Sequence, residues 1–579
     1  MTASRRDLIR AAAYFSALAG AASCGGPRTA APPSEATLPG RIDEQTIEAA
    51  EKLNALTFTA DERRMMLEGI ESQLETLAKI RGVSFSNADA PALAFDPKPP
   101  RAKIRSQKNT LTLGGDYSAA FPGSEEEVAY ASAGQQGAWL RRRQITSADL
   151  TEIYLKRIGK FDQKLSSYVT VTPDLARAQA AKADKELAGG KDRGPLHGIP
   201  YAVKDLADTA GVLTTWGAEP FRERIPDEDA KVVRKLREAG AVLLGKTACG
   251  AIAYGDQWFG GVTRNPWNLK EGSSGSSAGS AAATAAGLCT FAIGTETLGS
   301  IVSPSERCGT TGLRPTFGRV SRSGFMALCW SLDKVGPICR TAEDAAIVLS
   351  AINGYDADDP GAARHGFAYD GRADPKTMIV GYVPEWFEKG DDADRAALKA
   401  VKSLGVTMRE FPWPTLDFSA LETIVVVEAA AAFSDLTLTD RDDELSWQDA
   451  EAWPNTWRRA RFFPAVDYVQ IDRLRRKLML EMTAAFEGFD ALIGPHYAGG
   501  ALLAANATGH PQLVLRAGYA QTPPRSLFNE AARAAGTETF RTPRGVSLWG
   551  GLFQEGKIIA LGRALEKALG VARDRPPGF

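Results

Sequence analysis

From about residue 130 onward, helical patterns alternate along the chain with short apolar runs. Residues 146–149 (TSAD) form a capping signal for a helix that continues through Ile153 and Ile158. Residues 229–239 are typical of a second helix, and the run 241–244 that follows is apolar throughout, as in a buried strand. This alternation predicts an α/β fold with a substantially parallel sheet.

Composition excludes several classes of protein. The chain has 579 residues, of which 44% are hydrophobic and 24% charged, so it is neither a disordered chain nor a polytopic membrane protein. The net charge of −1 gives no basic excess for nucleic acid, and we expect no nucleic-acid partner. The six cysteines form no C-x-x-C pair, which argues against a zinc ribbon or a disulfide framework. We expect neither a metal nor a cofactor.

The first 24 residues are typical of an export signal. Arg5 and Arg6 precede the apolar run 8–22, which is too short to span a bilayer. The twin arginine resembles a Tat signal, and small residues suited to a signal peptidase follow it. We therefore predict a Tat-type signal peptide over 1–24 and a periplasmic location. Cys24 is a candidate lipidation site for anchoring to the membrane surface, although the usual Leu three residues earlier is missing. The alternative is a frayed basic N-terminus.

Residues 25–101 form a separate extension before the main domain. Residues 25–40 are rich in Gly, Pro, Ala and Ser and are predicted to be a tether. Residues 42–82 have helical spacing with a capping box at 59–62, so we predict a helical hairpin with an apolar stripe. Prolines between 91 and 100 indicate an extended linker. The stripe either packs on the main domain or binds a partner.

Three short catalytic motifs are interpreted as coincidences. Residues 240–247 satisfy the P-loop pattern, but their loop positions are strand-like and the helix precedes them. Residues 275–279 match the G-x-S-x-G elbow without the apolar strand that the elbow requires. Residues 331–334 match S-x-x-K, but no S-D-N or K-T-G element follows.

One set of residues remains as a candidate active site. Lys204 ends an apolar, strand-like run, where burial lowers the pKa of a lysine and suits it to act as a general base. The Gly/Ser cluster 272–280 supplies short hydroxyls, and the turn 294–300 supplies consecutive N–H groups for an oxyanion hole. A glycine-rich anion-binding loop is equally compatible with this composition.

The same region resembles the amidase signature family. The matching segments run in order along the chain: 197–200 (HGIP), 203–205 (VKD), 245–247 (GKT), 265–268 (NPWN), 274–280 (SGSSAGS), 299–301 (GSI) and 308–316 (CGTTGLRPT). Weaker similarity covers 130–570 and includes 506–511 (NATGHP). The resemblance implies one large α/β domain over 130–570, with a mixed sheet covered by helices on both faces. It also implies amide hydrolysis by a Ser-Ser-Lys triad.

Carried over residue by residue, the resemblance assigns roles to the cluster. Ser300 is the implied nucleophile, Ser276 the serine that relays its proton, and Lys204 the base. Ser277 supports the triad, and the peptide bond between Gly275 and Ser276 is expected to be cis. The implied oxyanion hole uses the N–H groups of Thr297, Leu298, Gly299 and Ser300.

The nucleophile turn departs from the family pattern. Glu296 stands where the family usually has Asp, Leu298 where it has Gly, and Val302 where it has Arg. Because Leu does not adopt a positive φ as readily as Gly, these changes put the oxyanion hole in doubt. We predict that Arg307 replaces the missing arginine as the partner of Glu296.

Three functions are compatible with these features. The first is an exported amidase that hydrolyses a small-molecule or peptide amide through an acyl-serine, in which the extension braces the catalytic domain and a homodimer is left open. The second is a weak or inactive binding protein on the same fold. The third is an A-type subunit of the tRNA-dependent amidotransferase, because the A subunit of that enzyme belongs to the amidase signature family. Residues 42–63 resemble its small C subunit, which would here be fused to the A-type domain. Specificity is expected from loops within 370–550, where Trp447, Trp453 and Trp457 either line a pocket or pack in the core.

Overall fold

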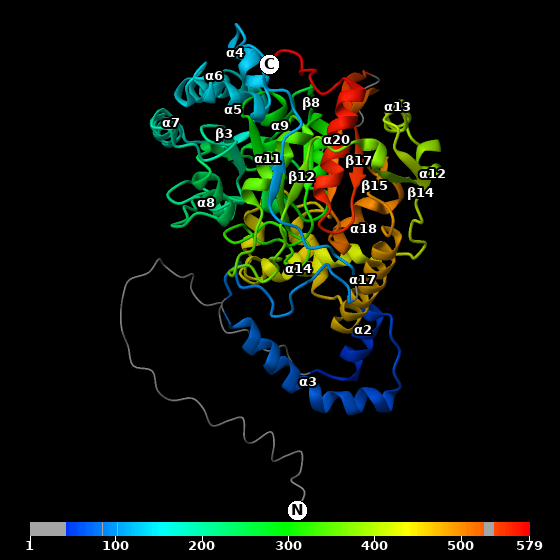
Figure 1. The fold of residues 1–579 in the computed structure, drawn as a ribbon. Helices are drawn as coiled ribbons and strands as arrows, with labels where there is room; N and C mark the ends of the chain where they lie inside the picture. The colour runs from blue at the N-terminus through cyan, green and yellow to red at the C-terminus, as the bar shows by residue number, and fades with distance from the viewer. Residues whose placement is uncertain (1–41, 84, 101, 526–537) are drawn as a thin grey trace, which may run out of the picture. The chain divides into compact units, whose positions relative to one another are not determined.

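The computed structural model describes residues 42–83, 85–100, 102–525 and 538–579 (Figure 1). The predictions for the twin arginine, Cys24 and the tether fall on residues 1–41 and lie outside these ranges. The chain divides into two compact units, of which Ala49–Thr57 and Phe85–Phe579 make up the larger one. No helix in the described ranges is long and apolar enough to cross a bilayer.

The N-terminal extension contains the two predicted helices, α2 (Glu44–Asn54) and α3 (Ala60–Arg81). The predicted capping box begins α3: Glu62 N–H donates to Thr59 Oγ1 at 3.3 Å, and the Glu62 carboxylate accepts from Thr59 N–H at 2.7 Å. Residues 85–100 form neither helix nor strand. The two helices thus lie where the helical pattern predicts them. The proline-rich segment has no regular secondary structure, since proline cannot donate to a helix or a ladder.

The larger unit is built on a mixed eleven-stranded sheet in the described part of the chain. The spatial order is β14-β13-β15-β17-β16-β10-β11-β9-β3-β4-β2. The strands are β2 (Tyr168–Val171), β3 (Pro200–Lys204), β4 (Val242–Thr247), β9 (Phe291–Glu296), β10 (Thr311–Arg314), β11 (Lys334–Cys339), β13 (Ile379–Tyr382), β14 (Thr407–Glu410), β15 (Ala491–Pro495), β16 (Gln512–Thr522) and β17 (Phe540–Trp549). Short strands β1 (Thr110–Thr112), β5 (Gln257–Trp258), β6 (Gly261–Val262), β7 (Arg264–Asn265), β8 (Asn268–Gly272) and β12 (Ala368–Asp370) pair outside it.

The sheet is less parallel than the alternation pattern alone predicts. β3 pairs in parallel with β4 and β9, and β13 with β14 and β15. In contrast, β16 and β17 form a long antiparallel pair, and β10 and β11 are antiparallel to their neighbours. The alternation therefore accounts for the parallel pairs but not for the antiparallel ones, whereas the mixed sheet agrees with the family resemblance.

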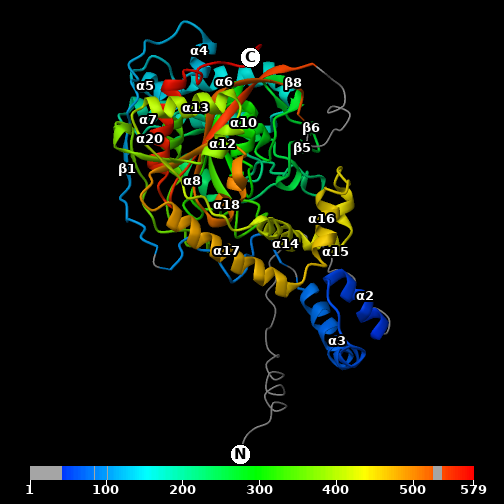
Figure 2. The ribbon, with the colours of Figure 1, turned by 90° about the vertical axis from the view of Figure 1, so that its right-hand side faces the viewer.

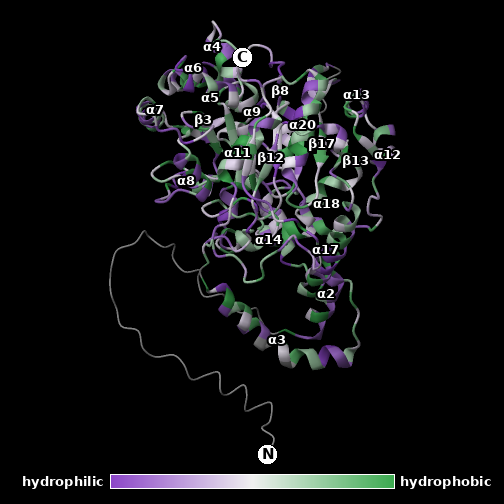
Figure 3. Cartoon of the chain, in the orientation of Figure 1, coloured by the Kyte–Doolittle hydropathy of each residue, from purple (hydrophilic) through white to green (hydrophobic). Residues whose placement is uncertain are grey.

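Helices cover both faces of the sheet (Figure 1). Along β16, Leu513 and Leu515 face the core that contains α11 and α20, and Val514 between them faces α9 and α10. This period of two is what a strand buried on both faces requires. Hydropathy also separates buried from exposed helices: in Figure 3 the buried α11 is largely apolar, whereas α8 carries many hydrophilic residues.

The α-helices in the described part of the larger unit that follow the linker are α4 (Glu125–Tyr130), α5 (Ala133–Arg141), α6 (Ser147–Leu165), α7 (Pro173–Ala188), α8 (Lys231–Glu238), α9 (Ala278–Ala285), α10 (Val302–Cys308), α11 (Ala342–Ile352), α12 (Pro384–Glu388), α13 (Asp392–Ser403), α14 (Thr423–Ala432), α15 (Ser434–Leu438), α16 (Trp453–Ala460), α17 (Ala465–Ala485), α18 (Ala501–Thr508) and α20 (Glu555–Leu569).

A second hydrophobic core lies among α14, α16, α17 and α18 (Figure 2). Trp453 and Trp457 are buried in it, and their rings stack with centroids 5.8 Å apart. Trp447 contacts Tyr254 instead, with ring centroids 5.1 Å apart. Of the two interpretations of these tryptophans, core packing therefore holds for Trp453 and Trp457.

A candidate active site at one sheet edge

The candidate site lies where the two parallel strands β3 and β9 end. Lys204 is the last residue of β3, and Glu296 is the last residue of β9. Because the carboxyl ends of parallel strands share one edge, the lysine and the turn that follows Glu296 are brought together. The helices α9 and α10 start near this edge, after Ser277 and Ile301 respectively.

Lys204 is fully buried and its amine contacts two hydroxyls. Its Nζ lies 2.8 Å from Ser276 Oγ and 2.8 Å from Thr295 Oγ1. Burial lowers the pKa of Lys204 to about 8, against weaker opposing effects of Cys249, Asp333 and Glu296. The neutral form that a general base requires is therefore far more populated near neutral pH than it is for an exposed lysine.

Ser276 and Ser277, two serines of the Gly/Ser cluster, connect the segments of the candidate site. The Gly275–Ser276 peptide bond is cis, as the family resemblance implies. Ser277 N–H donates to Ser300 O at 3.1 Å, so the Gly/Ser cluster and the turn 294–300 are joined beside Ser276. Ser277 Oγ donates to Thr295 O at 3.0 Å and accepts from Thr295 N–H at 3.2 Å. Ser277 thus supports the segment that positions Lys204.

The nucleophile turn presents a row of backbone amides. Among the described residues, no acceptor is found for the N–H groups of Thr297, Leu298, Gly299 and Ser300. The left-handed position of the turn is occupied by Gly299, with φ of 94°, whereas Leu298 is not in that region. The substitution of Leu for the family's Gly therefore causes no backbone strain here. The turn is compatible with an oxyanion hole.

Glu296 holds the nucleophile turn through hydrogen bonds from the backbone that follows Ser300. Its carboxylate accepts from Ile301 N–H at 2.9 Å and from Val302 N–H at 3.0 Å, at the start of α10. Arg314 donates to the other carboxylate oxygen at 2.8 Å, and both side chains are fully buried. Burial alone raises the pKa of Glu296, but Arg314 and Lys334 outweigh it and lower that pKa to about 2. Glu296 therefore stays ionised.

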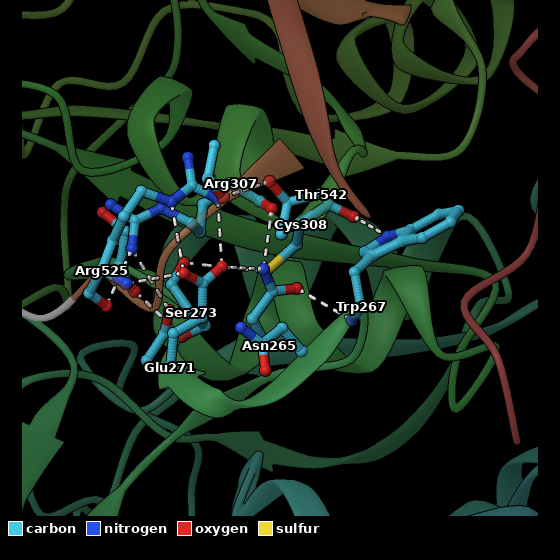
Figure 4. Close-up of polar contacts among 12 residues, drawn as sticks. Asn265, Trp267, Glu271, Ser273, Arg307, Cys308, Arg525 and Thr542 are labelled. Atoms are coloured by element: carbon cyan, nitrogen blue, oxygen red, sulfur yellow. Dashed lines mark hydrogen bonds and ion pairs between the residues drawn. The ribbon is translucent and has the colours of Figure 1, made fainter. Parts of the chain in front are cut away.

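The predicted pairing of Glu296 with Arg307 is wrong. Arg307 lies at the far end of α10 and donates to the carbonyls of Gly272 and Arg525, at 3.5 and 3.4 Å (Figure 4). Arg314 reaches Glu296 because β10 and β9 both flank β11 in the sheet. Proximity in sequence was therefore misleading. Arg314, on a strand two positions from β9 in the sheet, lies closer to Glu296 than Arg307 does at the far end of α10.

The motif at residues 265–268 secures the C-terminal end of α10 (Figure 4). Asn265 Nδ2 donates to Arg307 O at 3.1 Å, and Trp267 Nε1 donates to Cys308 O at 2.8 Å. The last carbonyls of a helix have no partner within it, so these side chains satisfy them. Glu296 does the same for amides at the other end, and α10 is held at both ends.

Sequence reasoning missed several contributors to the site. Thr295 holds the amine of Lys204, and Asn506 Nδ2 donates to Glu296 at 2.9 Å. Thr297 Oγ1 donates to Asp333 at 2.5 Å, and Lys334 Nζ donates to Thr297 O at 3.4 Å. Asn506 belongs to a segment that was matched to the family without a role. Thr295 and Thr297 lie in the predicted turn 294–300, but the sequence gives no role to their side chains. Asp333 and Lys334 reach the site through tertiary contacts alone.

Two of the motifs interpreted as coincidences contain residues with structural roles. Residues 240–247 run from the end of α8 into β4, and Lys246 is buried inside the sheet. The serine of the S-x-x-K match, Ser331, donates to Glu428 and accepts from Arg475. Among the described residues, no group of three or more His, Cys, Asp or Glu side chains is placed to hold a metal ion.

Comparison with known proteins gives one consistent result. Residues 149–559 match the family model described as Amidase. The chain is 34% identical to the A-type subunit of glutamyl-tRNA(Gln) amidotransferase from Desulfatibacillum aliphaticivorans, over 76% of this chain and 98% of that protein. It is 37% identical to AmiD of Mycobacterium tuberculosis, named as a candidate amidase, over 76% and 94%. The structure of a peptide amidase from Stenotrophomonas maltophilia superposes with a TM-score of 0.64 at 29% identity, covering 78% and 98%.

Proposed function

The chain belongs to the amidase signature family, hydrolases of amide C–N bonds, and from this premise we propose an exported amidase that acts through an acyl-Ser300 intermediate. One observation carries the assignment of residues. Lys204 Nζ lies 2.8 Å from Ser276 Oγ in a fully buried position, and burial lowers its pKa to about 8. The hydroxyl beside the buried lysine belongs to Ser276, and the next residue, Ser277, donates its backbone N–H to Ser300 O. This arrangement suits a proton relay from Ser300 to Lys204.

The proposed reaction has two halves. Ser300 Oγ attacks the amide carbonyl carbon while its proton passes to Ser276, whose own proton passes to neutral Lys204. The N–H groups of the turn 297–300 stabilise the negative charge that forms on the carbonyl oxygen. The C–N bond then breaks, and the amine leaves with a proton returned from Lys204 through Ser276. Water hydrolyses the ester on Ser300 by the same proton path.

Replacing the nucleophile tests this assignment. Ser300→Ala should abolish amide hydrolysis and covalent labelling by a fluorophosphonate, with circular dichroism unchanged. Ser303→Ala, three residues further along in α10, is the matched control and should keep both activities. Turnover near that of the wild type in folded Ser300→Ala would exclude Ser300 as nucleophile.

Export is proposed from the N-terminal sequence. Arg5, Arg6 and the short apolar run 8–22 support a Tat signal, and Cys24 is the candidate for a lipid anchor. Replacing both arginines by lysine should retain the uncleaved protein in the cytoplasm. Cys24→Ala should release an anchored protein into the soluble periplasmic fraction. A full-length chain that stays uncleaved in the cytoplasm of wild-type cells would exclude export.

A role as an amidotransferase A-type subunit is the second candidate. It is favoured by the 34% identity to the A-type subunit of glutamyl-tRNA(Gln) amidotransferase and by the resemblance of residues 42–63 to a C subunit. An isolated chain that hydrolyses small amides without tRNA or a partner supports the amidase. A chain that works only with tRNA and a second protein supports the alternative. An inactive binding protein is disfavoured by the braced turn.

A further inference from the structure

A cavity of about 280 Å³ adjoins the candidate active site. Thr295 and Thr297 line it on the catalytic side, and these residues contact Lys204 and begin the nucleophile turn. None of Lys204, Ser276 and Ser300 is among its described lining residues. The cavity therefore meets the candidate site at Thr297, the first residue of the proposed oxyanion turn. The carbonyl oxygen of the substrate would bind at this turn, so the cavity is next to the acyl side of the substrate.

The far wall of this cavity comes from the linker that follows the N-terminal helices. Asn87, Ala88 and Ala90 line it, although they lie more than 200 residues before the triad turn. Asn87 Nδ2 donates to Ala327 O at 2.8 Å, and Ala327 N–H donates to Asn87 Oδ1 at 2.7 Å. The amide side chain thus pairs with a peptide group as a neighbouring strand would, and it fixes the linker at this point.

The segment that receives Asn87 is also tied to the catalytic machinery. Met326 N–H donates to Leu206 O at 2.9 Å, two residues after Lys204. Leu328 N–H donates to Asp333, which also accepts from Thr297 Oγ1. Residues 326–328 therefore connect the linker to both the base and the oxyanion turn through short hydrogen bonds.

The lining indicates an uncharged ligand group. Apolar side chains contribute a large part of the lining: Leu206, Ala253, Phe325, Met326, Leu328 and Val335. Arg322 in the lining is paired with Asp359 at 2.6 Å, and Asp333 accepts three hydrogen bonds. Lys334, also in the lining, donates to Thr297 O at 3.4 Å, and burial lowers its pKa well below the usual range. An engineered apolar cavity of about 150 Å³ holds benzene. A volume of about 280 Å³ therefore suits an acyl group of one to two rings, or its aliphatic equivalent.

We propose that residues 87–90 form a built-in wall of the acyl pocket, and that the enzyme prefers amides of compact, uncharged, largely apolar carboxylic acids. The inference rests on the proposed role of Ser300. The small side chains of Ala88 and Ala90 leave the pocket open, and Asn87 sets the position of the wall. The linker thereby becomes part of the specificity of the catalytic domain.

Labelling rates test this without a known substrate. Two fluorophosphonates are compared, one with a methyl group and one with a biphenylmethyl group on phosphorus. Ala90→Phe should lower the labelling rate of the bulky probe at least tenfold and that of the methyl probe less than threefold. Leu93→Phe introduces the same ring at a linker position that is 93% exposed and outside the cavity. It should leave both rates unchanged.

Asn87→Ala provides a second variant, because it adds no bulk and removes both bonds to Ala327. It should reduce the discrimination between the two probes at least threefold. An unchanged ratio of rates in both Ala90→Phe and Asn87→Ala, with Ser300 still labelled, overturns the wall and leaves the amidase assignment intact. Equal slowing of both probes also overturns it. Absence of labelling in the wild type instead overturns the role of Ser300.

Discussion

Two fully buried lysines lie side by side in the sheet and differ in what faces them. Lys204 ends β3, and Lys246 lies in the neighbouring strand β4, paired in register with Val203. Lys246 Nζ is 3.6 Å from an oxygen of the Asp205 carboxylate and donates to Thr214 Oγ1 at 2.6 Å. Among the described residues, no carboxylate lies within 4 Å of Lys204 Nζ, whose close partners are the hydroxyls of Ser276 and Thr295.

The difference shows what separates a candidate base from a structural cation. Burial lowers the pKa of both lysines, but the charge of Asp205 opposes that shift at Lys246. A buried cation with a counter-ion is held in its charged form. A buried amine with hydroxyl partners can lose its proton at modest cost and take one from a serine. A buried lysine at this sheet edge can therefore serve as a base only where no carboxylate is close enough to hold its charge.

The largest expected effect tests the catalytic half of this comparison. Lys204→Met should reduce kcat for amide hydrolysis by at least three orders of magnitude, because the proton path from Ser300 then has no acceptor. Lys246→Met should keep kcat of its folded fraction within about tenfold. Steady-state kinetics on purified variants measure both. Comparable losses in the two folded variants would remove the distinction.

Arg314 extends the contrast to a second buried ion pair. Arg314→Met leaves the ionised Glu296 buried without its partner, which should destabilise the fold by about 3–5 kcal/mol. Turnover should fall as well, since Glu296 positions the start of α10. Arg307→Met is the matched control and should cost far less in both measurements. Urea denaturation and kcat provide the two readouts, and equal effects of the two variants would contradict the brace formed by Glu296 and Arg314.

Stability should change in opposite directions at the two lysines. Lys246→Met leaves Asp205 buried and unpaired and should be destabilising. Lys204→Met removes an amine whose pKa falls from 10.5 when unfolded to about 8 when folded. Between these pH values the unfolded chain binds more protons, so wild-type stability rises with pH. Lys204→Met should thus be more stable than wild type by up to about 3 kcal/mol below pH 8, and the gain should vanish above about pH 10.5.

Thermal melts at pH 7 and pH 10 measure this difference. Destabilisation by Lys204→Met at pH 7, equal to that of Lys246→Met, would show that Lys204 is also a structural cation.

The smallest expected effect concerns Leu298. Because the left-handed position of the turn is Gly299, Leu298→Gly should change kcat less than about threefold, although Gly adds flexibility to the unfolded chain. Gly299→Ala should be much more harmful, since its Cβ would lie 2.8 Å from Ser303 Oγ. A large gain of activity in Leu298→Gly would show that this residue impairs the oxyanion turn.

The sequence predicted which segments meet at the candidate site better than it predicted the contacts that support them. Lys204, Ser276 and Ser300 each lie in a short contiguous motif, and the segments that carry these motifs meet at one sheet edge. The partner of Glu296 was predicted wrongly, because contacts between strands two places apart depend on sheet order. Sheet order in turn depends on long connections whose path has no local sequence pattern. The linker wall at Asn87 belongs to the same class, with its partner 240 residues away.

The pH dependence of Ser300 labelling by a methyl fluorophosphonate tests the role of Lys204 most directly. We predict one rising limb with a midpoint near pH 8, set by loss of the proton from Lys204. The limb should be absent in Lys204→Met and unchanged in His197→Asn, since His197 precedes the end of β3 that is opposite Lys204. A limb near pH 6.5 that disappears in His197→Asn, or one that survives in Lys204→Met, would contradict the Ser-Ser-Lys mechanism.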